Sequence, residues 1–182
     1  MLRTKDILDE SDPRVRAENK PVTFPLNDTN KNIIPEMLKH LRYSQIEKLS
    51  KKYDLRPGMG LAAPQLGINE RFFVVCYEKD KGKFEDYILI NPKVISYSEE
   101  MIYAGEGEGC LSVNREVEGI VPRHARITME AYDMDGNLQK YRVREELAIA
   151  FQHELDHLNG ILFTDYIDPK NPYKDADNMR EI

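Results

Sequence analysis

The sequence predicts an α+β fold, in which antiparallel β-sheets pack around a central metal-binding helix and a further helix lies near the N-terminus. Helical and strand-like segments are separated along the chain, which favours α+β over repeated β-α-β units. The segment before Gly160 is apolar nearly all round, which is typical of a helix buried between other elements. With 182 residues, of which 41% are hydrophobic and 32% charged, the chain suits one compact domain over residues 1–182.

Charge and cysteine content exclude several classes of protein. The chain has 26 Lys and Arg against 32 Asp and Glu, and the resulting net charge of −6 argues against nucleic-acid binding. Only two cysteines are present, which is too few for the disulfide framework of a small secreted domain. Cys76 lies in an apolar segment and is expected to be a buried, inert thiol. Because the start lacks a signal peptide and no run of about 18 apolar residues could span a membrane, we expect a cytoplasmic protein.

The first third of the chain predicts an extended arm followed by a helix. Residues 1–25 are polar and contain three prolines, which favours extended segments that wrap the domain. From Ile33 to Tyr53, apolar residues recur every three or four positions, which is the period of a helix with one buried stripe. Residues 57–60 end this helix, and residues 61–67 form a loop of small residues where the backbone can approach another group closely.

The middle of the chain predicts antiparallel strands, because Val, Ile, Phe and Tyr are concentrated between turn residues. The expected strands are residues 71–77, 87–90, 93–97 and 126–132. Asp135-Gly136 is a hairpin signal that leads into a further strand at 138–143. The second predicted helix runs from Glu145 to Asn159, with acidic residues in its first turn and a glycine directly after it.

The most informative motif is His153-Glu154-Leu155-Asp156-His157 in this second helix. Two imidazoles four residues apart lie about 40° apart on one helix face, close enough to bind one metal ion. Glu154 and Asp156 each lie about 60° to one side, so geometry lets either carboxylate flank the metal. The chemistry favours Glu154, because the glutamate of the general His-Glu-x-x-His pattern acts as a base. A solvated helix face is the alternative, but the apolar flanks favour burial, and buried imidazoles need partners.

A catalytic site of this kind needs a third protein ligand and an open position for water. No histidine follows His157 in the chain. Acidic residues further on are possible ligands, namely Asp165, Asp168 and Glu181. Cys110 is the better candidate, because it lies in a glycine-flanked stretch between strands. One thiolate and two imidazoles suit Zn²⁺, Fe²⁺, Co²⁺ or Ni²⁺ rather than Mg²⁺ or Ca²⁺.

Three separated segments resemble, in order, the three motifs of the peptide deformylase family. They are GMGLAAPQ at 58–65, EGCLS at 108–112 and QHELDHLNG at 152–160. The resemblance spans most of the chain. The long stretch between the first two motifs, and the lack of a long helix after the third, are similar to the type II subclass of many Gram-positive bacteria.

The resemblance implies hydrolysis that removes the N-formyl group from the N-terminal methionine of nascent polypeptides and releases formate. The implied metal ligands are Cys110, His153 and His157. They would hold one divalent ion, natively Fe²⁺, with Zn²⁺, Ni²⁺ or Co²⁺ able to replace it. Glu154 is implied as the base and then the acid, and Gln65 with the backbone N–H of Leu111 as donors to the oxyanion. A loop-capping hydrogen bond is the alternative role for Gln65.

The same segments indicate how substrate would be recognised. Ile149 and Ala150 lie on the metal-bearing face of the helix, one turn before the first histidine, and could wall an apolar pocket for the methionine side chain. Ordinary core packing is an equal alternative for both. Met59, Gly60 and Gly109 resemble the family's segments that pair with the substrate backbone.

Five polar residues outside the ligand set also have expected positions. Glu108 and Arg123 resemble an ion pair that supports the metal-binding segment, an exposed pair being the alternative. Asp156 is expected to orient a histidine or cap local structure. His40 and His124 lie outside every motif and are expected at the surface.

Two other functions fit parts of the pattern. One is a zinc endopeptidase with an unrecognised downstream carboxylate ligand, and the other is a binding module with a closed, four-ligand structural metal site. The expected partners are formyl-methionyl nascent peptides, with no membrane and no direct contact with nucleic acid. Contact with the ribosome is an expectation from the family alone, because the acidic net charge indicates no docking patch.

Overall fold

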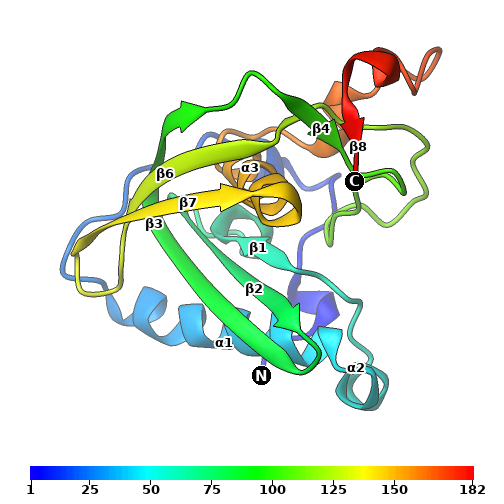
Figure 1. Cartoon of the computed structure of the whole chain (residues 1–182). Helices are drawn as coiled ribbons and strands as arrows, with labels where there is room; N and C mark the ends of the chain where they lie inside the picture. Colours follow the sequence, from blue (N-terminus) through cyan, green and yellow to red (C-terminus); the bar gives the residue numbers. More distant parts are fainter.

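A five-stranded antiparallel sheet forms the main layer of the computed structural model, which describes residues 1–182 (Figure 1). Its strands are, in spatial order, β1 (Gly60–Ala62), β2 (Phe72–Asp80), β3 (Lys83–Tyr97), β6 (Arg126–Tyr132) and β7 (Leu138–Arg144). A second sheet is small, and its strands are β5 (Arg123–His124), β4 (Met101–Tyr103) and β8 (Arg180–Glu181). The prediction of an α+β fold with antiparallel sheets is confirmed.

Two of the three α-helices, α1 (Asp28–Gln45) and α3 (Glu145–Leu158), cover the main sheet, and α2 (Glu47–Tyr53) packs against α1; short 3₁₀ helices connect the other segments. The 3₁₀ helices are η1 (Thr4–Asp6), η2 (Pro13–Arg16), η3 (Ala63–Leu66), η4 (Phe163–Tyr166) and η5 (Ala176–Asn178). Figure 1 shows α1 below the sheet and α3 enclosed by its curled upper strands. None of the helices is long and apolar enough to cross a membrane.

Strand β2 explains why α3 lies at the centre of the molecule. Its residues 72–76 are fully buried on both faces, and successive side chains point to opposite sides of a sheet. Phe72 and Val74 belong to the apolar cluster that contains α1, whereas Phe73 and Val75 belong to the cluster that contains α3. The sheet is therefore covered on both faces, and α3 carries its histidines into the interior.

The first helix differs from its prediction at both ends. It begins at Asp28 rather than Ile33, because the side chain of Asn27 accepts a hydrogen bond from the N–H of Asn30 and caps the helix. The expected single helix is also divided in two, since Ile46 has an extended backbone between α1 and α2. The arm before it contains only extended segments and short 3₁₀ turns, as predicted.

Several strand predictions were incomplete. The strands expected at 87–90 and 93–97 are parts of one strand, β3, whose pairing is irregular around Asn91, a residue with a φ of 51°. The second sheet was missed, because its strands are only two or three residues long and β8 pairs in parallel with the distant β4.

The surface position expected for His40 was wrong. His40 is fully buried on the apolar stripe of α1, and its Nδ1 lies 3.1 Å from the carbonyl oxygen of Leu2. Burial lowers the pKa of this imidazole, so the neutral ring packs in the core. His124 is half-buried, and its ring lies 4.3 Å from that of Tyr97 between centroids.

Candidate metal centre and its cavity

Three buried side chains from two distant parts of the chain form a candidate metal centre. Cys110 follows the long segment after β4, and His153 and His157 lie one turn apart on α3. One ligand atom from each lies within 4.8 Å of the other two. The Sγ of Cys110 is 3.3 Å from the Nε2 of His157. Ligands at the bond lengths of a tetrahedral zinc site are about 3.4–3.6 Å apart, so these donors fit a single ion.

The contacts of the donors also suit a metal ion. The Nδ1 of His153 lies 2.8 Å from a carboxylate oxygen of Glu108, which leaves its Nε2 toward the other donors. Burial lowers the pKa of His157 well below its usual value, so this imidazole is neutral. The Sγ of Cys110 accepts a hydrogen bond of 3.5 Å from the N–H of Ser112.

A buried network of charged side chains contacts the Nδ1 of His153. Arg123 donates to both oxygens of Glu108 at 2.8 and 2.9 Å, and to Asp156 at 2.6 Å. Arg123 and Glu108 are only 3% and 5% exposed, so the ion pair between them is present and buried. Burial would raise the pKa of Glu108, but hydrogen bonds from His153 and Arg123 lower it to about 2. Asp156 contacts this arginine and orients no histidine directly.

Glu154 is the buried carboxylate beside the donors. It is 4% exposed, and its Oε2 has no hydrogen-bond partner. Burial raises the pKa of Glu154 to about 7. Its carboxylate fills the space where a Cβ on Gly60 would lie, so only glycine fits at that position of β1.

Gln65 and Leu111 bring two hydrogen-bond donors to the same place. The Oε1 of Gln65 accepts from the N–H of Ala62 at 2.9 Å, which is the loop-capping contact. Its Nε2 donates to Ser112 Oγ at 3.0 Å and lies 3.7 Å from the sulfur of Cys110. The backbone N–H of Leu111 makes no hydrogen bond within the chain.

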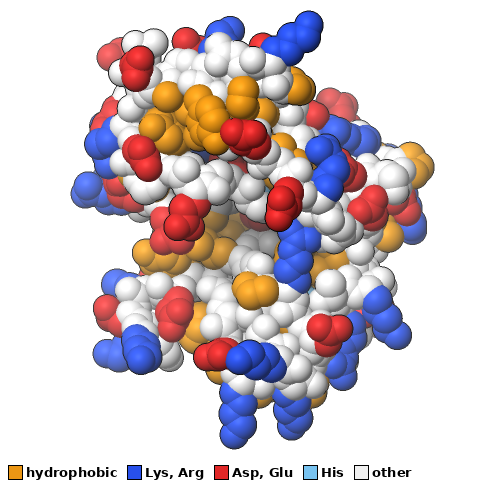
Figure 2. All heavy atoms as spheres, turned by 90° about the vertical axis from the view of Figure 1, so that its right-hand side faces the viewer, with side chains coloured by type: hydrophobic (Ala, Val, Ile, Leu, Met, Phe, Trp, Pro, Cys, Tyr) orange, Lys and Arg blue, Asp and Glu red, His pale blue; other side chains and the backbone are white.

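These groups open onto one cavity with a volume of about 1070 Å³. Figure 2 shows the hollow on the face at the right of Figure 1, with hydrophobic side chains beside it. The five predicted substrate-binding residues all line it, namely Met59, Gly60, Gly109, Ile149 and Ala150. Cys110, His153 and Glu154 line the same cavity, whereas His157 is buried and does not.

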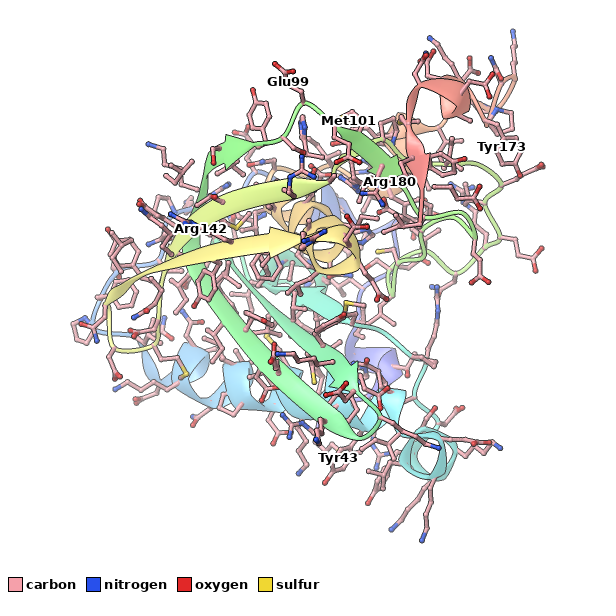
Figure 3. The ribbon with its side chains drawn as sticks, in the orientation of Figure 1. Tyr43, Glu99, Met101, Arg142, Tyr173 and Arg180 are labelled. Atoms are coloured by element: carbon pink, nitrogen blue, oxygen red, sulfur yellow. The ribbon has the colours of Figure 1, made fainter.

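The last residues of the chain form part of the cavity wall. Glu181 and Ile182 line it, and Arg180 fastens the strand through hydrogen bonds to Glu100 and Glu145 (Figure 3). The sequence analysis missed this wall, since it depends on pairing between β8 at the end of the chain and β4 near its middle. It also missed Arg56, which lines the cavity directly before the first motif.

A sequence profile of the polypeptide deformylase family matches residues 4–173, which is nearly the whole chain. The chain belongs to the peptide deformylase family. Hydrolytic removal of the N-formyl group from nascent peptides is the activity of this family, and the chain is therefore a hydrolase of protein biosynthesis. The region after Gly160 holds no α-helix, as expected, while the type II subclass stays a prediction.

Relatives and solved structures agree with this assignment. The chain is 44% identical to the peptide deformylase of Oceanobacillus iheyensis and 45% identical to that of Staphylococcus epidermidis, over 100% of both chains in each case. Among crystal structures, the peptide deformylase of Thermotoga maritima is similar with a TM-score of 0.69 and 35% identity, covering 90% of this chain and 97% of that one. A probable peptide deformylase of Synechococcus phage S-SSM7 gives a TM-score of 0.72 at 32% identity, covering 88% and 98%.

Proposed function

We propose that this peptide deformylase holds one divalent metal ion through Cys110, His153 and His157. One observation supports this most strongly: the three donor atoms lie within 4.8 Å of one another, and two of them, on Cys110 and His153, belong to residues that line the cavity. Fe²⁺ is the native ion by resemblance to the family, and Zn²⁺, Ni²⁺ and Co²⁺ suit the same sulfur and nitrogen donors. When bound, the ion supplies Lewis acidity, which polarises a carbonyl and makes water more acidic.

Glu154 acts as the general base and then as the general acid. It takes a proton from the attacking water and later gives it to the amine that leaves the formyl carbon. Its position supports this role, because the carboxylate is buried beside the donors and its Oε2 is free of other hydrogen bonds. Asp156, the alternative from helix geometry, is occupied by Arg123.

Gln65 and Leu111 stabilise the negative charge that develops on the formyl oxygen. The side-chain N–H of Gln65 lies beside Cys110, and the N–H of Leu111 is available to donate to this oxygen. Each such donor contributes roughly 3 kcal/mol in comparable oxyanion holes. The contact between Gln65 and Ala62 orients the amide, so capping and catalysis are compatible roles.

The substrate binds as an extended chain with its methionine side chain in the apolar part of the cavity. Ile149 and Ala150 form the wall of that pocket. Strand β1 pairs with β2 along one edge only, which leaves the backbone of Gly60 open to a peptide on the other edge, while the carbonyl of the neighbouring Met59 accepts from the N–H of Cys76. A Cβ on Gly109 would meet nothing within 4 Å, so this backbone is open to close approach. We place the activity in the cytoplasm, in one domain over residues 1–182, with formylated nascent chains as substrates and the ribosome as their source.

Formate release separates this function from its rivals. The metal-loaded protein is expected to release formate from formyl-Met-Ala-Ser and to leave internal peptide bonds intact. Cleavage of an unformylated peptide would instead support an endopeptidase, and a closed site with four protein ligands would support a binding module.

A substitution at Glu154 tests its role within the same assay. Glu154→Gln is expected to keep its metal and lose at least about 100-fold in turnover, the range typical of a lost general base. Glu99→Gln, an exposed residue that makes no side-chain hydrogen bond, is the matched control. A metal-replete Glu154→Gln variant with wild-type turnover would remove this residue from the role of base.

A further inference from the structure

Arg56 makes an unusual set of contacts for an arginine at the edge of a cavity. Its guanidinium donates to the carbonyl oxygens of Cys110 and Val113 at 2.7 and 2.9 Å, and to the side-chain oxygen of Asn114 at 3.1 Å. No carboxylate lies within ion-pair distance of it. All hydrogen bonds of the guanidinium therefore go to residues 110–114, which we call the metal loop.

The metal loop carries two proposed functional groups on consecutive residues. Cys110 supplies the sulfur donor, and Leu111 supplies the free backbone N–H that faces the oxyanion. A displacement of the loop moves both groups together relative to the imidazoles of α3. Since second-shell contacts commonly change metal affinity by about 10–100-fold, the support of this loop matters for function.

Packing around the metal loop is incomplete. A second cavity of about 390 Å³ adjoins the first, and Arg56, Gly109 and Cys110 line both. Gly107 precedes the loop with a φ of 80°, and a Cβ on Gly109 would meet nothing within 4 Å. The approach to Cys110 therefore contains two glycines and borders a cavity on two sides, so hydrogen bonds help to fix the position of this buried residue.

Gln65 contacts the loop through the sulfur of Cys110 and the hydroxyl of Ser112, and the remaining contacts hold its far end. The carbonyl of Ser112 accepts from the N–H of Glu10 at 2.7 Å, and Asn114 donates to Asp9 at 2.7 Å. At Cys110, the carbonyl accepts from the N–H of Val113 within the same turn, at 3.1 Å. The guanidinium is thus the contact that joins this carbonyl to a separate part of the chain.

We propose that Arg56 is a positioning residue for the metal centre, an inference that rests on the proposed role of Cys110 as a ligand. Its planar, forked guanidinium bridges the metal loop, because Nη2 donates to the carbonyl oxygens of Cys110 and Val113 while Nη1 donates to the side chain of Asn114. These contacts hold the sulfur and the Leu111 N–H in place. A lysine keeps the charge and the apolar stem but has no such fork, because its ammonium is a single point of charge. Arg56→Lys therefore keeps the positive charge and removes only the forked arrangement of donors.

Arg115→Lys is the matched control for this substitution. Arg115 lies next to the metal loop, but its guanidinium contacts only Glu10, at 2.7 and 3.2 Å. It lines the second cavity and not the first. A lysine at this position changes the same chemical group without touching a carbonyl of the loop.

The test uses the full chain loaded with Co²⁺ and measures three quantities. They are the rate of Co²⁺ transfer to a chelator, the thiolate-to-Co²⁺ absorption band, and kcat and KM with formyl-Met-Ala-Ser. Arg56→Lys is expected to release Co²⁺ about tenfold faster or more, with an altered band and a lower kcat, in the range of other second-shell changes. KM and the Tm of the metal-free protein are expected to change little, and Arg115→Lys is expected to match the wild type.

Each other outcome overturns a defined part of the inference. Wild-type release rate and spectrum in Arg56→Lys would overturn the positioning role while leaving the metal centre intact. A raised KM with unchanged release would make Arg56 a substrate contact instead. Equal effects of Arg56→Lys and Arg115→Lys would show that Arg56 contributes only to the general stability of the loop. Absence of a thiolate band in the wild type would overturn Cys110 as a ligand, and with it both this inference and the proposed metal centre.

Discussion

Replacing Arg123 with methionine removes the cation from the buried charge chain behind His153. The substitution keeps most of the apolar stem but leaves Glu108 and Asp156 without their three hydrogen bonds from the guanidinium. Both Arg123 and Glu108 are at most 5% exposed, so water cannot replace those bonds. Breaking a buried ion pair by removing one partner typically costs about 3–5 kcal/mol.

The pKa of Glu108 gives the scale of the electrostatic part of this cost. Hydrogen bonds from His153 and Arg123 lower it from 4.5 to about 2 in the folded protein. At about 1.4 kcal/mol for each pKa unit, the whole shift corresponds to roughly 3 kcal/mol of stability at neutral pH, of which Arg123 contributes a part. For a chain of this length, a loss of 3–5 kcal/mol lowers the Tm by about 6–20 °C.

Guanidinium unfolding of the metal-free protein at pH 7, followed by circular dichroism, measures this cost. Arg126→Met is the matched control, because Arg126 and its partner Glu100 are 52% and 38% exposed, and exposed pairs contribute about 1 kcal/mol or less. The reasoning is refuted if Arg123→Met costs under about 1 kcal/mol, or no more than Arg126→Met does.

Lowering the pH should reduce the difference in the free energy of unfolding between Arg123→Met and the wild type. Because the folded pKa of Glu108 lies below its unfolded value of 4.5, its stabilisation is fully present above that pH. It is lost as the pH falls from 4.5 toward about 2. The two unfolding curves should therefore converge over this range, and a constant separation would assign the cost to packing instead.

Three further outcomes follow from individual contacts. Gly60→Ala is expected to lose turnover while keeping its metal, because the new Cβ would displace the carboxylate of Glu154; normal formate release by this variant would contradict the contact. Gly109→Ala is expected to raise KM while changing stability by less than about 0.5 kcal/mol, because its Cβ would meet no protein atom but would face the substrate; an unchanged KM would argue against backbone pairing there. Burial raises the pKa of the Cys76 thiol to about 12. Ellman's reagent at pH 8 should therefore label only Cys110 in the folded, metal-free protein, and both thiols in guanidinium. Rapid labelling of two thiols without denaturant would show that Cys76 is accessible.

The local periodicity of the sequence was sufficient to predict the buried helix face that carries the two histidines. The spacing of His153 and His157 predicts a shared helix face, and the apolar flanks predict that this face is buried; both features are present. Helix geometry alone left Glu154 and Asp156 equivalent. Their roles differ because Arg123, in strand β5, donates a hydrogen bond to Asp156 and none to Glu154.

Long-range contacts account for what the sequence analysis missed. Strands β4 and β8 are too short to have a pattern, and they pair across almost half of the chain, at Ile102 and Arg180. His40 has a polar side chain on an apolar helix stripe, and only the arm that covers it explains its burial. The partners of Arg56 are backbone carbonyls more than 50 residues away, and a backbone carbonyl leaves no signal in the sequence.

The proposal that one metal ion held by Cys110, His153 and His157 drives deformylation can be tested by a single titration. The protein is freed of metal, reconstituted anaerobically with increasing Co²⁺, and assayed for formate from formyl-Met-Ala-Ser at each measured metal content. We expect formate release to rise in proportion to bound metal and to saturate at about one ion per chain, the content of a site with a single three-ligand set. Full release of formate by the metal-free protein, or one tightly bound ion without any formate, would contradict the account.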